Sequence, residues 1–263
     1  MAMRVVLAAV FLISLHFKKS HGVAGPSMYV DNQTEKIICI GDSLTQGFYN
    51  IPNKYHPYTI ELSRLLNQKN KHSHGFNKHD IDEKKSKSGQ RNRHFYEVVN
   101  SGVGGQKVIG EMEKNLLNVL RHKFNVKLAI ILGGINDIIH MNNTDYMKLY
   151  QGIKLLHDKA HKRSIKSVVV TIPEALVNNQ KVKYLTFKKY NHLRTQVNRM
   201  LRKYVRESNG HSILCDLERK FPLFELSESK MESLWTIDNV HPTPKGYDEI
   251  GRIMFECIRN VLT

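Results

Sequence analysis

The stretch Lys36-Ile37-Ile38-Cys39-Ile40-Gly41-Asp42-Ser43-Leu44 decides the fold of this 263-residue chain. Its first five residues predict a β-strand buried on both faces, because short apolar runs rich in β-branched residues are typical of such strands. Gly41 then permits a tight turn, and Ser43 follows where the strand ends. A buried strand that ends in polar residues favours an α/β protein with a site at that end.

The rest of the chain repeats this pattern of apolar runs separated by segments with helical spacing. Strands are predicted at residues 36–40, 95–99, 126–132, 167–172 and 212–215, and helices at residues 57–66, 108–120, 146–161, 185–206 and 244–261. Strands that alternate with helices predict a parallel sheet with helices on both faces. Because right-handed crossovers bring the carboxyl ends of all strands to one edge, the glycine-rich segments after the second and third strands are expected beside Ser43.

Length and composition are typical of one α/β domain, since 41% of the 263 residues are hydrophobic. At the N-terminus, Arg4 precedes an apolar run at residues 5–15, and Ser20-His21-Gly22 supplies small residues for cleavage. This pattern predicts a signal peptide at residues 1–22 and a secreted protein, or one of the secretory pathway; the alternative is an amphipathic start to the mature protein. The apolar run is shorter than the about 20 residues that span a membrane. Residues 23–263 then form a single domain.

Residues 68–93 interrupt the alternation with a run of Lys, His, Asn, Ser and Gly. Such a composition predicts a solvated insertion in the domain. Its histidines, His72, His74 and His79, lack the ordered spacing of metal ligands and a companion cysteine pair. We therefore expect neither a metal nor another cofactor.

The chain is strongly basic, with a formal net charge of +16 from 40 Lys and Arg against 24 Asp and Glu. This excess attracts anionic surfaces such as acidic lipid or nucleic acid. The basic residues are scattered and no aromatic-interleaved basic motif is present, so we expect no specific nucleic-acid partner. An anionic membrane surface stays open as a partner, although a solvated helix face explains the charges of residues 185–206 equally well.

The three cysteines, Cys39, Cys215 and Cys257, have no metal or redox spacing. Their apolar surroundings favour buried free thiols, while one disulfide stays open in an oxidising compartment. Glycosylation sequons begin at Asn32 and Asn142 and have meaning only for a chain secreted by a eukaryote.

Three polar residues have the chemistry of acyl transfer. Ser43 becomes nucleophilic only when a neighbouring base takes its proton, and that base needs a third group to orient it. Asp238 and His241 stand three residues apart on one segment, so the carboxylate can orient the imidazole. Taken alone, the Gly41-Asp42-Ser43 segment is more often a turn with an Asx hydrogen bond, and Asp238 with His241 more often an ordinary surface pair.

Acyl transfer also needs donors for the oxyanion of the tetrahedral intermediate. Residues 100–105 bring backbone N–H groups near a substrate, because glycine removes the steric barrier to close approach. Asn136, which follows the third strand, supplies a side-chain amide, although an isolated Asn at such a place more often caps a helix.

With these residues the chain resembles the SGNH hydrolases, also called GDSL esterases or lipases. The matching blocks, in family order, are Gly41-Asp42-Ser43-Leu44, Asn100-Ser101-Gly102-Val103-Gly104-Gly105, Gly133-Gly134-Ile135-Asn136-Asp137 and Asp238-Asn239-Val240-His241-Pro242. The resemblance implies a three-layer, flavodoxin-like α/β fold whose five-stranded parallel sheet has the order 2-1-3-4-5. It also implies that Ser43 is the nucleophile, His241 the base and Asp238 its partner. The implied oxyanion donors are the backbone N–H groups of Ser43 and Gly105 and the side chain of Asn136.

The function that we expect is hydrolysis of carboxylic esters, small or lipid-like, through an acyl-enzyme. The resemblance leaves a lysophospholipase or a thioesterase of the same fold open. A non-catalytic basic protein that binds anionic membranes or nucleic acid is the alternative from another class. The absence of a Gly-x-Ser-x-Gly motif argues against the α/β-hydrolase fold.

Overall fold

A five-stranded parallel sheet organises the domain. The structure is a computed structural model that describes residues 34–50, 54–68, 95–140, 145–176 and 187–262. The strands lie in the order β4 (Tyr96–Gly102), β1 (Glu35–Gly41), β5 (Val126–Leu132), β6 (Lys166–Val170) and β7 (Ser212–Cys215). All four pairings are parallel. Counted along these five strands alone, the order is 2-1-3-4-5, which confirms the predicted sheet.

Several predictions from the sequence fall outside the described residues. These are the signal peptide at residues 1–22, residues 69–93 of the polar insertion with His72, His74 and His79, and both sequons, which begin at Asn32 and Asn142.

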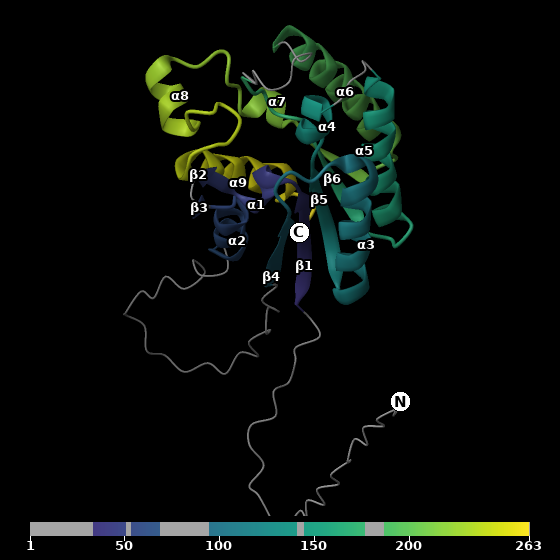
Figure 1. Cartoon of the computed structure of the whole chain (residues 1–263). Helices are drawn as coiled ribbons and strands as arrows, with labels where there is room; N and C mark the ends of the chain where they lie inside the picture. The colour runs from purple at the N-terminus through teal and green to yellow at the C-terminus, as the bar shows by residue number, and fades with distance from the viewer. Residues whose placement is uncertain (1–33, 51–53, 69–94, 141–144, 177–186, 263) are drawn as a thin grey trace, which may run out of the picture. The chain divides into compact units, whose positions relative to one another are not determined.

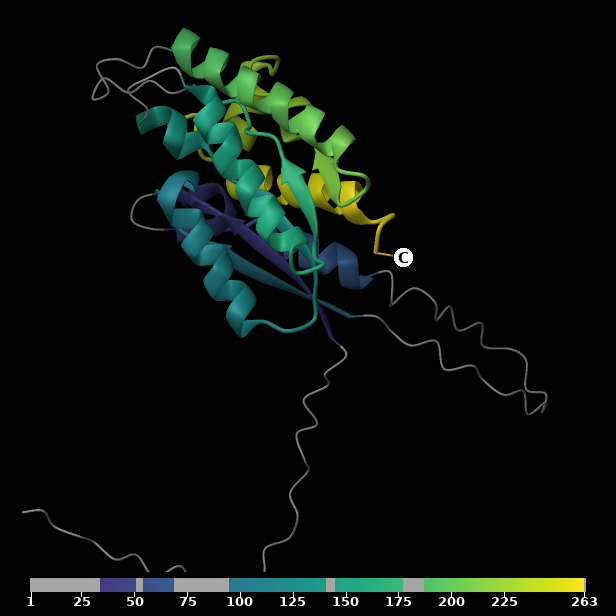
Figure 2. The same cartoon turned by 90° about the vertical axis from the view of Figure 1, so that its right-hand side faces the viewer.

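Helices cover both faces of the sheet, so the fold has three layers (Figures 1 and 2). On one face, α2 (Thr59–Gln68) contacts β4, and α9 (Pro244–Ile258) contacts α2 and β7. On the other face, α5 (Tyr146–His161) contacts β5 and β6, with α3 (Glu113–His122) and α6 (Phe187–Glu207) beside it. None of the helices in the described ranges has the length and hydropathy needed to cross a membrane.

The elements follow the hydrophobic pattern closely. Helix α5 and strands β5 and β7 have the predicted bounds, and the three isoleucines of β1 are fully buried. The predicted helix at residues 108–120 is instead kinked: the segment η1 (Val108–Met112) has non-helical dihedral angles at Ile109 and Gly110, and α3 follows it. Gly110 adopts φ +87° there, a conformation that interrupts a right-handed helix.

Short elements that the apolar pattern did not predict lie mostly at the carboxyl edge of the sheet (Figure 1). They are α1 (Ser43–Gln46), the antiparallel pair β2 (Phe48–Asn50) and β3 (Lys54–Tyr55), α4 (Ile135–His140), α7 (Leu217–Lys220) and α8 (Glu228–Leu234). They are too short for a periodic apolar pattern to develop.

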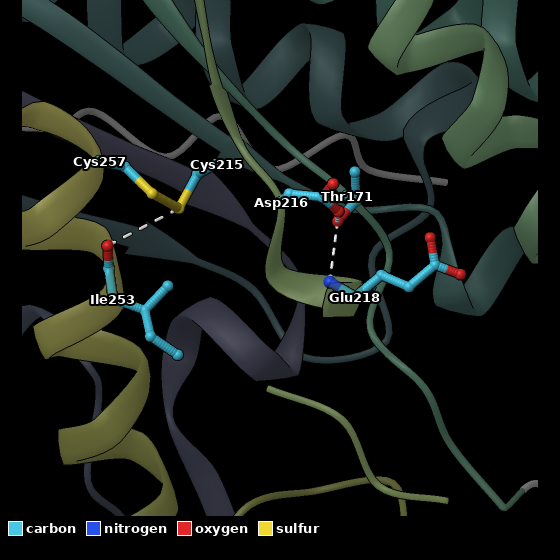
Figure 3. The surroundings of a disulfide bond; sticks show 6 residues. All are labelled: Thr171, Cys215, Asp216, Glu218, Ile253 and Cys257. Carbon is cyan, nitrogen blue, oxygen red and sulfur yellow. Dashed lines mark hydrogen bonds between the residues drawn. A yellow bond between two sulfur atoms is a disulfide. The ribbon is translucent and has the colours of Figure 1, made fainter. Parts of the chain in front are cut away.

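The expectation of three free thiols is wrong for two of them. Cys215, the last residue of β7, and Cys257 in α9 form a disulfide, as Figure 3 shows. Packing of α9 against β7 brings their Cα atoms to 5.5 Å, within the range that a disulfide spans. This proximity depends on packing between elements 42 residues apart, so no local spacing signals it. Cys39 is a buried free thiol, and burial raises its pKa to about 12.

Candidate active site

Strand β1 delivers Ser43 to the carboxyl edge of the sheet. Ser43 begins the short helix α1, and Asp42 is the N-cap, whose Oδ1 accepts a hydrogen bond from the Leu44 N–H at 2.9 Å. This Asx hydrogen bond is the one expected of an ordinary turn, and here it fixes the direction in which α1 leaves the strand. Ser43 itself is half-buried.

A rigid loop before α9 delivers the acid and the base. Trp235 and Pro242 form an antiparallel bridge, and the Thr236 N–H donates to the His241 carbonyl at 2.9 Å. Asn239, at the tip, has φ +51°, a left-handed conformation that Asn tolerates better than most residues. The loop therefore holds Asp238 and His241 in a closed turn with its own backbone hydrogen bonds.

The structure brings the three predicted catalytic residues into one hydrogen-bonded chain. Ser43 Oγ lies 2.8 Å from His241 Nε2, and His241 Nδ1 lies 2.7 Å from Asp238 Oδ2. Ser43 and His241 are 198 residues apart in the sequence. The chain has the spacing that a hydroxyl, an imidazole and a carboxylate need to pass a proton from Ser43 to the ring.

The ionisation of Asp238 determines which nitrogen of His241 has the proton. Burial by itself would raise the pKa of Asp238, but hydrogen bonds from the His241 ring and from the His241 and Val240 N–H groups hold it well below its ordinary value. The Thr236 hydroxyl adds a further bond of 2.7 Å to Oδ1. An ionised carboxylate only accepts hydrogen bonds, so Nδ1 is the protonated nitrogen and Nε2 faces Ser43 with a free lone pair.

Phe48 of β2 packs edge-on against the His241 ring. Their ring centroids lie 4.9 Å apart, with an interplanar angle of 75°. The buried Tyr247 in α9 donates its hydroxyl to the Phe48 carbonyl at 2.7 Å, which fixes this strand relative to the base. Phe48 thus limits rotation of the imidazole, and no pattern in the sequence signalled this contact.

The second block, after β4, uses its residues in different ways. Asn100 donates to the Thr45 carbonyl at 2.7 Å and to Thr59 Oγ1 at 3.2 Å, so it anchors the end of α1. Gly102 lies against the backbone of Thr45 and Gln46, where a side chain would collide. Gly105 has φ +75° with open space around its Cα. Within the described residues, its N–H has no hydrogen-bond acceptor.

The third block supports the second. Asn136 Nδ2 donates to the Gln106 carbonyl at 3.1 Å, which orients the amide and uses one of its two N–H groups. The carboxylate of Asp137 accepts the N–H groups of Val108 at 2.8 Å and Ile109 at 3.1 Å. Asp137 therefore fixes the segment that follows Gly105, a function that the sequence did not suggest.

Asp42 is a buried carboxyl group close to this network. It is fully buried, and in the described part of the structure its Oδ2 has no hydrogen-bond partner. Burial raises its pKa to about 7, although the hydrogen bond from the Leu44 N–H acts in the opposite direction. Near neutral pH this group is therefore partly protonated, in contrast to Asp238.

The predicted site residues thus lie at one edge of the sheet, at the ends of β1, β4 and β5 and in the loop before α9. In register, Gly41 of β1 pairs with Gly102 of β4 and Leu132 of β5, so these three strands end together. Among the described residues, no group of three or more His, Cys, Asp or Glu side chains is arranged to hold a metal ion.

This three-layer fold is that of the GDSL or SGNH class of ester hydrolases. The family described as GDSL-like lipase/acylhydrolase matches residues 37–254, and the chain belongs to this family of ester hydrolases. No curated protein matches the sequence.

Solved structures share the fold at low sequence identity. The lipase/acylhydrolase from Enterococcus faecalis is 16% identical, with 87% of this chain and 97% of that chain covered and a TM-score of 0.56. Est24, a carbohydrate acetylesterase from Sinorhizobium meliloti, is 15% identical, with 87% and 100% covered and a TM-score of 0.58. The aryl esterase of M. smegmatis is 16% identical, with 86% and 99% covered and a TM-score of 0.59. The likeness confirms the predicted three-layer fold.

Proposed function

We propose that the protein hydrolyses carboxylic esters with Ser43 as nucleophile and His241 as general base. Asp238 orients the imidazole of His241 and stabilises its protonated form. The observation that supports this most is the continuous chain of contacts at 2.8 Å and 2.7 Å between these three side chains. A base within hydrogen-bond reach of the nucleophile, itself oriented by a carboxylate, is the arrangement that activates serine.

The reaction proceeds in two halves. Ser43 Oγ attacks the ester carbonyl carbon while His241 Nε2 takes the hydroxyl proton, and Asp238 stabilises the imidazolium that forms. The same proton passes to the alcohol oxygen as the ester bond breaks, which leaves an acyl group on Ser43. Water, deprotonated by His241, then attacks this acyl group and releases the acid.

The oxyanion donors belong to the proposal as well. The backbone N–H groups of Ser43 and Gly105 and the second N–H of Asn136 are our candidates. The Gly105 N–H, which has no acceptor among the described residues, and the orientation of Asn136 by Gln106 support this choice. Losing one such donor costs about 3 kcal/mol of transition-state stabilisation.

Two exposed apolar side chains favour esters with an apolar part. Ile237, next to Asp238, is fully exposed, and Val103, two residues before Gly105, is 46% exposed. Such residues on two loops of the site offer contact area to an acyl chain. Lysophospholipid is then a specific candidate, whereas the carbohydrate acetylesterase and the acetyl xylan esterase among the structural relatives suggest a short acetyl group instead.

One panel of substrates tests both the chemistry and the acyl preference. It includes nitrophenyl esters of two to twelve carbons, lysophospholipid, acyl-CoA and acetylated xylan. Ser43→Ala should reduce turnover on the order of 10⁶-fold, as in other triad enzymes, without changing the thermal midpoint. Full activity of purified Ser43→Ala would refute the assignment. Labelling of the wild type by a fluorophosphonate, absent in Ser43→Ala, excludes a purely binding function.

We also propose that the protein matures in the secretory pathway. The Cys215–Cys257 disulfide supports this, because disulfides persist mainly in oxidising compartments. The leader predicted at residues 1–22 agrees with it. N-terminal sequencing of the protein from the medium of expressing cells should begin after Gly22; retention of residues 1–22 in the cytosol would contradict the proposal.

A further inference from the structure

A pocket of about 330 Å³ lies between the segment that joins α7 to α8 and the first turns of α9, and Leu234 and Lys245 in its lining flank the loop that holds Asp238 and His241. Pockets of this volume are at the lower end of those that hold small ligands. It takes no part in the proposed ester hydrolysis.

The walls of this pocket are apolar. Phe221, Pro222, Leu226 and Leu234 line it, and their side chains range from buried to half-buried. These residues offer a surface that gains free energy from contact with a hydrocarbon chain. These apolar walls therefore favour a ligand with an aliphatic part.

Its rim is cationic. Lys220, Lys230 and Lys245 line the pocket, all three are exposed, and none forms an ion pair with a described residue. Glu249 is the one carboxylate in the lining, and it already lies 2.9 Å from Arg252. The pocket thus presents three ammonium groups against one carboxylate, and that carboxylate already pairs with Arg252.

The position of Lys245 adds to this excess of positive charge. It lies in the first turn of the 15-residue helix α9, which has no acidic residue in that turn. The N-terminal end of a helix already has partial positive charge, so a lysine there is unfavourable until an anion binds nearby. An anionic group at the rim would offset both the charge of Lys245 and the partial positive charge at the N-terminal end of α9.

We propose that this pocket binds an alkyl carboxylate, the anion of a medium-chain fatty acid, with its chain on the apolar walls and its head between the lysines. The apolar walls and the cationic rim lie in one cavity, and this pairing matches an amphiphile with a single anionic head. The choice of a carboxylate rests on the proposed function, because ester hydrolysis releases such an acid, and Leu234 and Lys245 of the pocket flank the loop that holds Asp238 and His241.

The pocket has an internal reporter. Trp235, the only tryptophan of the chain, is 2% exposed, and its ring lies 4.9 Å from that of Phe221 in the wall. Leu234, another wall residue, accepts the Thr243 N–H at 2.9 Å. A ligand that displaces these walls therefore changes the surroundings of Trp235.

The test is a titration of the Ser43→Ala protein with decanoate below its micellar concentration, followed by Trp235 fluorescence and by calorimetry. We expect saturable binding at one site. Decan-1-ol should bind at least about tenfold more weakly, because it lacks the charge. The double variant Lys230→Gln, Lys245→Gln should lose about tenfold in affinity for decanoate. Lys114→Gln, which removes an exposed lysine of α3 without a described ion pair, serves as the matched control and should bind as its parent does.

Three results would overturn the proposal. They are the absence of saturable decanoate binding, equal affinity for the alcohol, and an affinity that the double lysine variant leaves unchanged. Tighter binding of anionic phospholipid vesicles than of decanoate would assign the pocket to a lipid head group instead. Because Ser43→Ala has no nucleophile, this binding result is independent of turnover, and the substrate panel judges the proposed function separately.

Discussion

Replacing Gly102 by alanine should disable the site without a change in any group that touches substrate. A Cβ at this position would lie 2.6 Å from the carbonyl carbon of Thr45 and 2.8 Å from Gln46 Cα, whereas ordinary contact begins at 3.4 Å. These are backbone atoms of α1 and cannot rotate away. The Cβ would also collide with the Gln46 backbone nitrogen, so helix α1 must move by at least about 0.8 Å relative to β4, and it takes Ser43 with it.

A displacement of this size is large compared with the tolerance of catalysis. Ser43 Oγ now lies 2.8 Å from His241 Nε2, and a misplacement of about 1 Å costs on the order of 10²-fold in rate. We expect kcat/KM for nitrophenyl acetate to fall by about that factor in Gly102→Ala. Overpacking should also lower the free energy of unfolding by about 1–3 kcal/mol, which leaves the variant folded at 25 °C.

Gly104→Ala is the matched control, two residues further along the same loop. Its Cβ would meet the Gln46 Oε1 atom at 2.8 Å, the end of a flexible side chain that can rotate away. We expect kcat/KM within about twofold of the wild type, as for a surface substitution. Equal activity of the two folded variants, with circular dichroism as the check of folding, would refute the argument that Gly102 sets the position of α1.

The remaining predictions concern the acid, a buried histidine and the disulfide. Asp238→Asn should lower kcat by about 10⁴-fold in steady-state assays, because an amide no longer enforces the required tautomer; a loss below tenfold would contradict this. Burial lowers the pKa of His157 from 6.5 to about 3, so acidification favours the unfolded chain, which takes the proton. Asp42, with its pKa raised to about 7, has the opposite effect on the pH dependence of stability. The contribution of His157 is therefore isolated by comparing the wild type with a variant that lacks this histidine. The difference in unfolding free energy between wild type and His157→Gln, measured in urea, should change by about 2 kcal/mol from pH 6.5 to pH 5; a constant difference would count against it. Cys215→Ser with Cys257→Ser opens a loop of 42 residues and should cost about 4 kcal/mol of stability, seen as a lower urea midpoint. Dithiothreitol should then affect only the wild type.

The sheet was predictable because its central strands β1, β5 and β6 are buried on both faces. Apolar runs such as that of β5 are typical of strands buried on both faces, and α5 shows helical spacing throughout its length. The division of the helix at residues 108–120 was not predictable from apolar spacing. It depends on the backbone conformation of Gly110 and on the two hydrogen bonds that Asp137 accepts from the Val108 and Ile109 N–H groups.

The site was predictable where its chemistry is local in the sequence. Asp238 and His241 stand three residues apart, so their contact needs only one turn. The contact of Phe48 with the His241 ring and the disulfide join residues that are far apart in the chain. Both contacts depend on how α9 packs against the sheet, and no sequence pattern near either pair of residues predicts them.

The distance in sequence between Ser43 and His241 has a consequence for the biosynthesis of the protein. A growing chain presents the Ser43 hydroxyl 198 residues before its base has been made. On the mechanism proposed above, Ser43 has no general base until the loop before α9 has been made and that helix packs on α2, so its hydroxyl is until then an ordinary alcohol. If Ser43 and His241 act as we propose, a translation product that stops before residue 241 lacks the general base and has no esterase activity.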